Sequence, residues 1–255
     1  MTDTGERLAI DVTSVKGKLK DHKDLADLVK AITSYEASQS ILAELREASS
    51  TIDEIAKIQL DPTMRKRVGA ALMTHAVITY CRATHSKSDA RWKVGIVNRY
   101  SADQAQKHRR IVDLRDKVIA HFGFPGEAHG ARWHDERVVA KVVNGVESNG
   151  LVLKRANFLA DAIADLIELL SVAIEEGKRI GEERGKAMSE AILSKLDDQR
   201  VLSAFQSSPF DPYTFWGPGE AADAFWGIAH GEKTERFVLP FQTSFQISGR
   251  ATTSG

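Results

Sequence analysis

Residues 158–174 read FLADAIADLIELLSVAI, and this stretch gives a clear indication of the fold class. Its apolar residues return every three or four positions, as they do on one face of an α-helix. Three acidic residues, Asp161, Asp165 and Glu168, interrupt the run, and the cost of inserting them excludes a membrane-spanning helix. The stretch therefore predicts a long amphipathic helix that packs against other helices.

Similar periodicity extends over much of residues 1–200, which we interpret as a mainly α-helical bundle. Further helices are expected over residues 35–59, 62–83 and from about Ser101 to His121. The second of these opens with Asp61-Pro62, a capping residue followed by proline at the first helical position. Gly123-Phe-Pro-Gly126 is expected to end the third.

A short β-hairpin is expected at about residues 136–154, inserted into the bundle. The segment is rich in valine, and Asn144-Gly145 and Asn149-Gly150 are both turn dipeptides. Residues 151–154 supply the return strand.

Three glycines spaced by four, Gly177, Gly181 and Gly185, follow the opening stretch. They indicate either a weakened or bent joint or a face that another helix approaches closely. In a chain without a membrane span we favour the joint, because glycine costs a helix about 1 kcal/mol relative to alanine.

The composition changes near residue 200. Ten of the 18 aromatic residues and four of the six prolines lie in residues 201–255, which we expect to form an irregular C-terminal extension. Its aromatic side chains either pack over the bundle, the interpretation we favour, or form an arm that binds a partner.

The charges are balanced overall but not along the chain. Lysine plus arginine equals aspartate plus glutamate, 35 each, yet residues 65–117 carry 13 basic and only four acidic residues. Such a segment is suited to bind a polyanion through salt-sensitive phosphate contacts. The alternative is a solvated face that the acidic residues 1–64 neutralise in space.

The chain has a single cysteine, Cys81, and its first residues contain no apolar core typical of a signal peptide, so we expect a cytoplasmic protein. No histidine and cysteine spacing matches a zinc site, and we expect neither a metal nor another cofactor.

The third helix ends in Leu-Arg-Asp-Lys-Val-Ile-Ala-His, residues 114–121. At roughly 100° per residue, Arg115 and His121 flank opposite sides of the apolar stripe that contains Ile111 and Leu114. Arg110, Lys117 and His121 fall along one line of the same helix.

This octapeptide resembles the signature of the HEPN superfamily, helical bundles with an arginine, a following polar residue and a histidine after four to six residues. The form found here is most similar to the HEPN domains of bacterial abortive-infection systems, in toxins and phage-defence effectors. The similarity is specific only over residues 114–122, and Asp116 stands where the family often has asparagine.

The resemblance implies a metal-independent endoribonuclease that acts as a homodimer. Attack of a ribose 2′-hydroxyl on the adjacent phosphate cuts the RNA, with His121 as general base or acid, Arg115 stabilising the phosphate charge and Asp116 orienting them. His108, Arg109, Arg110 and Lys117 are the candidates for binding RNA phosphates, and a protein inhibitor or antitoxin is an expected partner. The alternative is a non-catalytic helical protein of the same fold that binds a nucleotide or a protein partner.

Overall fold

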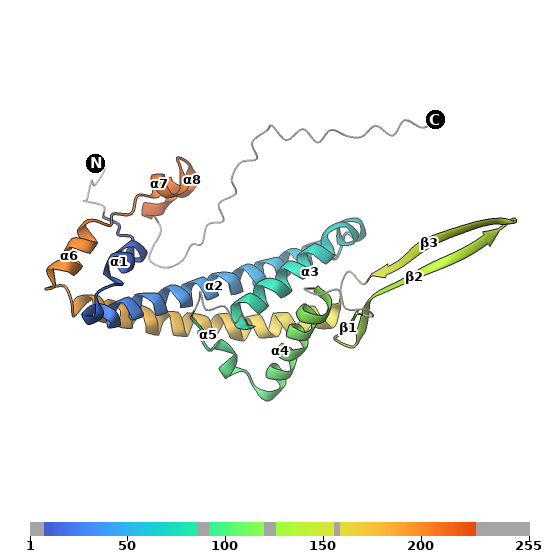
Figure 1. Ribbon diagram of the computed structural model, residues 1–255, viewed down its shortest axis with the longest axis horizontal. Coiled ribbons are helices and arrows are strands. Elements are labelled where there is room, and N and C mark those ends of the chain that lie inside the picture. The colour runs from blue at the N-terminus through green and yellow to red at the C-terminus, as the bar shows by residue number, and fades with distance from the viewer. Residues whose placement is uncertain (1–7, 86–91, 120–125, 156–158, 228–255) are drawn as a thin grey trace. The chain divides into compact units, whose positions relative to one another are not determined.

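The computed structural model describes residues 8–85, 92–119, 126–155 and 159–227. In these ranges the protein is mainly helical and has a small antiparallel sheet (Figure 1). The chain divides into two compact units, Thr13–Ala204 and a smaller one formed by residues 1–12 together with residues 205–255. From the sequence we expected a body of residues 1–200 and an extension of residues 201–255.

The larger unit contains most of the secondary structure. Its helices are α1 (Val12–Leu19), η1 (Lys23–Leu25), α2 (Ala26–Ile58), α3 (Pro62–His85), η2 (Ile96–Arg99), α4 (Ala102–Leu114), the π-helical turn η3 (Arg115–Ile119), α5 (Ala160–Leu193) and α6 (Gln199–Gln206). Its strands β1 (Gly126–Ala128), β2 (Ala131–Val143) and β3 (Val146–Arg155) form one antiparallel sheet in that order.

Helix α2 is the centre of the bundle, because it packs against both α3 and α5 (Figure 1). Leu45 of α2 and Leu166 and Leu169 of α5 are fully buried in the shared core. This confirms the amphipathic helix predicted from residues 158–174, from Ala160 onward. None of the described helices combines the length and the hydropathy that crossing a bilayer requires.

A local sequence signal sets the beginning of α3 but not that of α2. At the start of α3, Asp61 Oδ1 accepts hydrogen bonds from the backbone N–H groups of Thr63 (2.9 Å) and Met64 (3.0 Å), as the Asp61-Pro62 signal predicts. Helix α2, in contrast, begins at Ala26 and not at residue 35, since buried residues such as Leu28 and Ile32 extend its apolar face toward the N-terminus.

The glycines of α5 lie on a face that α2 approaches closely. A Cβ atom on Gly177 would be 3.3 Å from Leu42 Cδ1, and one on Gly185 would be 3.1 Å from Tyr35 Cε2. The helix continues unbroken to Leu193, so the break that we favoured from the sequence is absent. Because these glycines have no side chains, α2 and α5 can pack closely against each other.

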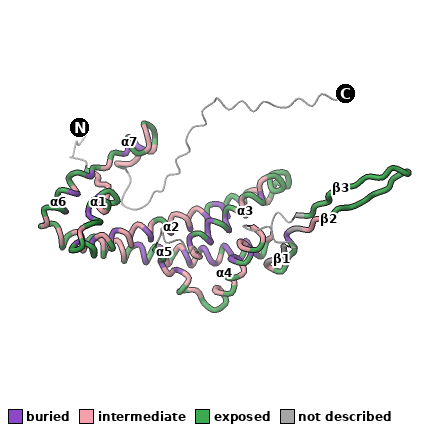
Figure 2. Tube along the Cα trace, in the orientation of Figure 1, coloured by how far each residue is buried: buried purple, intermediate pink, exposed green. Residues whose placement is uncertain are grey.

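The expected hairpin is confirmed, with β2 and β3 paired from His134↔Arg155 to Val143↔Val146. Asn144 (φ 53°) and Gly145 (φ 80°) make the turn in the left-handed region. The second predicted turn, Asn149-Gly150, is wrong: both residues lie inside β3. The side chains from Val138 to Lys154 are exposed (Figure 2).

The smaller unit joins the two ends of the chain by backbone pairing. Ile10 forms an isolated antiparallel bridge with Pro209, and the N–H of Asp11 donates to the carbonyl of Ser208 at 2.9 Å. This pairing between residues far apart in sequence was not predicted.

The described part of the C-terminal extension contains short helices, so the prediction of an irregular extension is wrong there. They are α7 (Pro212–Trp216), α8 (Glu220–Ala224) and η4 (Phe225–Gly227). Phe210 lies 5.2 Å from Phe225 and 5.9 Å from Trp216 between ring centroids, so the aromatic side chains pack on one another. Residues 228–255 lie outside the described ranges.

Candidate functional site

Helix α4 carries most of the predicted site residues, and its own sequence fixes where it begins. Ser101 Oγ accepts a hydrogen bond from the N–H of Gln104 at 3.2 Å, and Gln104 Oε1 accepts one from the N–H of Ser101 at 3.1 Å. This capping box confirms the predicted start. Ile111 and Leu114 are fully buried, as the predicted apolar stripe requires, and they anchor the helix in the bundle.

The α-helical geometry ends at Leu114, and η3 continues the chain as a π-helical turn. A π-helix bonds residue i to residue i+5, so each residue advances by less than the roughly 100° of an α-helix. The angle calculated between Arg115 and His121 on a straight α-helix therefore does not apply. His121 itself lies outside the described residues.

Arg115 and Asp116 are held together on this turn. Arg115 Nε donates to Asp116 Oδ1 at 2.7 Å, and Nη2 donates to the same oxygen. The Arg115 side chain is 26% exposed, and Nη1 makes no hydrogen bond within the described part of the chain. The arrangement compensates the negative charge of Asp116 and leaves guanidinium N–H donors for an anion.

Arg110 is committed to a nearly buried cluster. Its Nη2 atom donates to Asp165 Oδ2 at 2.7 Å, and His129 Nε2 lies 2.9 Å from the same oxygen. The side chains of Asp165 and His129 are only 10% and 5% exposed. The cluster ties α4 and the β1–β2 turn to α5, which gives Arg110 a structural task.

Other cations of the basic segment are also paired. Lys117 Nζ lies 2.9 Å from Asp113 on an exposed surface, Lys107 pairs with Asp103 and Glu168, and Arg99 pairs with Glu176. Arg82 pairs with Glu44 of α2. The excess of positive charge over residues 65–117 is reduced in space by Glu44, Glu168 and Glu176, which lie outside that segment, whereas Asp103 and Asp113 belong to it. Our alternative interpretation expected this compensation from residues 1–64. However, much of the compensating charge comes from α5 and not from residues 1–64.

His108 belongs to a hydrogen-bonded cluster between α3 and α4. Its Nδ1 atom lies 2.9 Å from the hydroxyl of Tyr80, which lies 3.0 Å from that of Tyr100. Burial, together with the neighbouring His85 and Arg109, lowers the pKa of His108 to about 4. His108 is therefore neutral at pH 7 and offers hydrogen bonds, not charge.

A pocket of about 400 Å³ opens beside this cluster, which we call the basic pocket. Its lining residues are His85, Gln106, His108, Arg109, Arg110, Val112 and Asp113. Arg109 is exposed and forms no ion pair with any residue that the structure describes. Arg109 is therefore the predicted phosphate-binding residue with the freest guanidinium.

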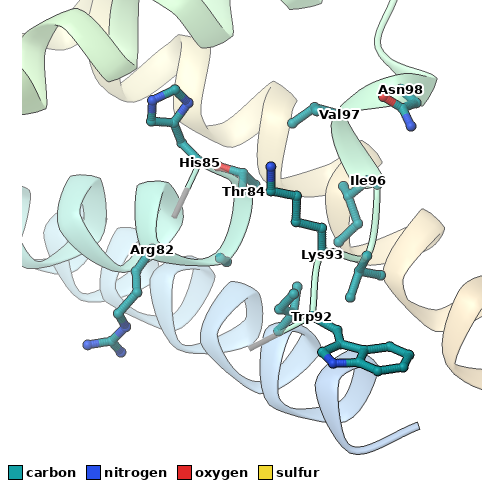
Figure 3. A pocket seen from close by; sticks show the side chains of 12 residues that line it. Arg82, Thr84, His85, Trp92, Lys93, Ile96, Val97 and Asn98 are labelled. Carbon is teal, nitrogen blue, oxygen red and sulfur yellow. The ribbon is translucent and has the colours of Figure 1, made fainter. Parts of the chain in front are cut away.

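A second pocket of about 450 Å³ lies where α3 ends and η2 begins, and we call it the Trp92 pocket (Figure 3). It is lined by Ile41, residues 82–85 and residues 92–98, and none of these is acidic. His85 lines both pockets, so they lie on either side of one imidazole.

Arg115 lies near Cys81 of α3. Burial raises the pKa of the Cys81 thiol to about 12, while the nearby Arg115 lowers it and Asp116 raises it. Cys81 is one helical turn before His85, which lines the basic pocket.

Sequence reasoning did not assign a role to Tyr80, His85 or Lys93. The contacts that join them to the site connect α3, α4 and the segment before η2, so no spacing in the sequence reveals them. The usable signal was the presence of Trp92 and Tyr100 among the basic residues, because aromatic rings beside cations are typical of nucleic-acid-binding surfaces.

Among the described residues no three His, Cys, Asp or Glu side chains are placed together to hold a metal ion. Comparisons with protein-family models, with curated proteins and with solved structures found no match to this chain. The functional argument therefore depends on the residues and their geometry.

Proposed function

We propose that the protein is a metal-independent endoribonuclease of the HEPN type, acting as a toxin or phage-defence effector. The observation that carries the proposal is the Arg115–Asp116 pair on η3, with guanidinium donors to spare, six residues before His121. Arg109 and the basic pocket support it, because they offer a phosphate an exposed cation on α4, the helix that leads into η3.

The proposed reaction needs no external nucleophile. The 2′-hydroxyl of one ribose loses its proton to His121 or its counterpart and attacks the adjacent phosphorus. The bond from phosphorus to the 5′-oxygen of the next nucleotide breaks, and that oxygen takes up a proton. The products are a 2′,3′-cyclic phosphate and a 5′-hydroxyl, and Arg115 stabilises the negative charge that develops on the phosphate oxygens.

The proposal includes a homodimer and a protein inhibitor as partners. Two copies would bring a second Arg115 and His121 to one RNA phosphate, so that the base and the acid come from different chains. An inhibitor would keep such an activity in check in the cell that makes it.

A non-catalytic function is the second candidate, and the Trp92 pocket favours it. A pocket whose described lining has an exposed indole, a lysine and no acidic residue is suited to a nucleotide whether or not the chain cuts RNA. This candidate predicts binding without cleavage.

The decisive experiment incubates RNA with the purified protein in EDTA and identifies the new ends. We expect cyclic phosphate ends. Arg115→Ala should slow cleavage about 10²- to 10³-fold, which is the usual effect of removing a donor to a developing oxyanion. His121→Ala should slow cleavage about 10²- to 10⁴-fold, because the general acid–base group is lost. Arg179→Ala, an exposed arginine of α5, is the matched control and should cut normally. Equal cleavage by the wild type and His121→Ala would contradict the proposal.

Expression in a bacterial host gives an independent readout. Growth should slow with the wild type and recover with Arg115→Ala or His121→Ala at equal protein levels. Absence of toxicity and of cleavage, together with retained nucleotide binding, would favour the non-catalytic function.

A further inference from the structure

The Trp92 pocket combines two features that the proposed catalytic residues do not use. Trp92 is 43% exposed, whereas Trp133, for comparison, is 6% exposed. The described residues that line the pocket include Arg82, His85 and Lys93 but no aspartate or glutamate. An exposed indole beside basic groups is typical of a surface on which a nucleic-acid base stacks.

The basic groups are not equivalent. The Arg82 side chain points away from Lys93 and His85, and its guanidinium pairs with Glu44 (Figure 3). The Lys93 side chain extends toward Thr84 and His85, and its ammonium pairs with no carboxylate among the residues that the structure describes (Figure 3). An ammonium and an imidazole that line one pocket, with no carboxylate among its described residues, favour an anion between them.

The backbone that carries Trp92 and Lys93 is anchored. Val94 and Ile96 immediately after them are 9% and 3% exposed, and Ile96 begins η2. Gly95, at φ 79°, makes the left-handed turn that η2 needs at its start. The side of the pocket formed by residues 94–96 is therefore held in place before a ligand arrives, which lowers the entropic cost of binding.

From these contacts we propose that the Trp92 pocket binds one nucleotide unit, with its base stacked on Trp92 and its phosphate between Lys93 and His85. A volume of about 450 Å³ lies within the usual range for small-ligand pockets. Because His85 also lines the basic pocket, the next phosphate of a strand would reach Arg109. The assignment of the pocket as an RNA subsite rests on the proposed nuclease function. The binding of a nucleotide in the pocket does not depend on that function.

The test measures binding without cleavage. Fluorescently labelled 2′-O-methyl hexaadenylate has no free 2′-hydroxyl, so the proposed reaction cannot cut it, and anisotropy gives its affinity for the full-length protein in EDTA. We expect Trp92→Ala to weaken binding about 5- to 100-fold, in line with the loss of one base stack. Trp92→Phe should restore most of the affinity, which a purely structural role of the indole would not predict.

The salt dependence separates the phosphate contact from the stacking contact. Lys93→Ala should reduce the slope of log affinity against log salt by about 1, while Trp92→Ala leaves the slope unchanged. Lys66→Ala is the matched control, since Lys66 is an exposed lysine near the other end of α3, and it should behave as the wild type.

Two comparisons assign the ligand and separate this inference from the nuclease proposal. If the protein binds the hexamer more tightly than adenosine monophosphate, the pocket is assigned to RNA. If it binds the two probes with equal affinity, and both depend on Trp92, the pocket is assigned to a free nucleotide. Binding that depends on Trp92 without any cleavage contradicts the nuclease alone. If folded Trp92→Ala and Lys93→Ala proteins bind both probes as the wild type does, the inference is wrong, whatever the cleavage assay gives.

Discussion

Similar apolar side chains are buried in the α2–α5 bundle and exposed in the β2–β3 hairpin. In the bundle, Leu166 and Leu169 are fully buried between helices. In the hairpin, Val138 and Val146 are 80% and 70% exposed, although both lie in a regular antiparallel ladder. The bundle is thus stabilised by packing between distant segments, whereas the hairpin is stabilised by its own backbone pairing and its Asn144-Gly145 turn.

The largest expected difference follows from this contrast in burial. Leu166→Ala should lower the free energy of unfolding by about 2–5 kcal/mol, because it removes buried methyl groups and leaves a cavity. Val138→Ala should change it by less than about 0.5 kcal/mol, because the side chain is already in water. Urea unfolding followed by far-UV circular dichroism measures both, and equal losses would contradict the comparison.

Glycine substitutions sharpen the comparison at an intermediate scale. Gly177→Val should destabilise the bundle by about 1–3 kcal/mol, since even a Cβ atom would lie 3.3 Å from Leu42 Cδ1. Gly150→Val, with nothing within 4 Å of its Cβ position in β3, should be neutral or slightly stabilising. Thermal unfolding of the two variants distinguishes the sites, and a stabilising Gly177→Val would show that α2 and α5 separate easily.

Mild acid should lower the free energy of unfolding of the bundle, and this is the smallest of the three expected effects. The pKa of His108 is about 4 in the folded protein, below the ordinary value of 6.5, so the unfolded chain binds its proton first. Stability should therefore fall as the pH decreases from about 6.5 through 4, by about 1–2 kcal/mol after allowing for partial solvent exposure.

The control for this acid effect is His108→Gln, which keeps a polar group near Tyr80 but cannot take up a proton. Its unfolding free energy should depend less on pH over the same window. The hairpin between Asp135 and Lys154 contains no histidine, so its local order should not change in that window. An unchanged pH dependence in His108→Gln would mean that other groups cause the loss.

The features that were predicted correctly depend on residues close together in the sequence. The Asp61 and Ser101 caps act within three residues, and the hairpin turn consists of two adjacent residues, Asn144 and Gly145. Periodicity over a dozen or more residues was enough to place the main helices.

The predictions that were wrong concern residues whose role depends on a distant partner. Asn149-Gly150 has the composition of a turn, but pairing with Val139 and Ala140 holds it inside β3. Glycine at position 181 favours a helix break, but α2 lies against it: a Cβ atom on Gly181 would be 2.9 Å from Gln39 Nε2. In both cases a contact with a segment distant in sequence outweighs the local conformational preference.

The sequence by itself determined the mainly helical class and the hairpin, because these follow from periodicity and turn residues. Only the tertiary structure decided that Arg110 is bound to Asp165 and His129, that His108 is neutral beside Tyr80, and that Trp92 and Lys93 share a pocket with His85. The physical reason is that burial and charge compensation depend on which side chains meet across the core. Segments far apart in sequence supply those side chains.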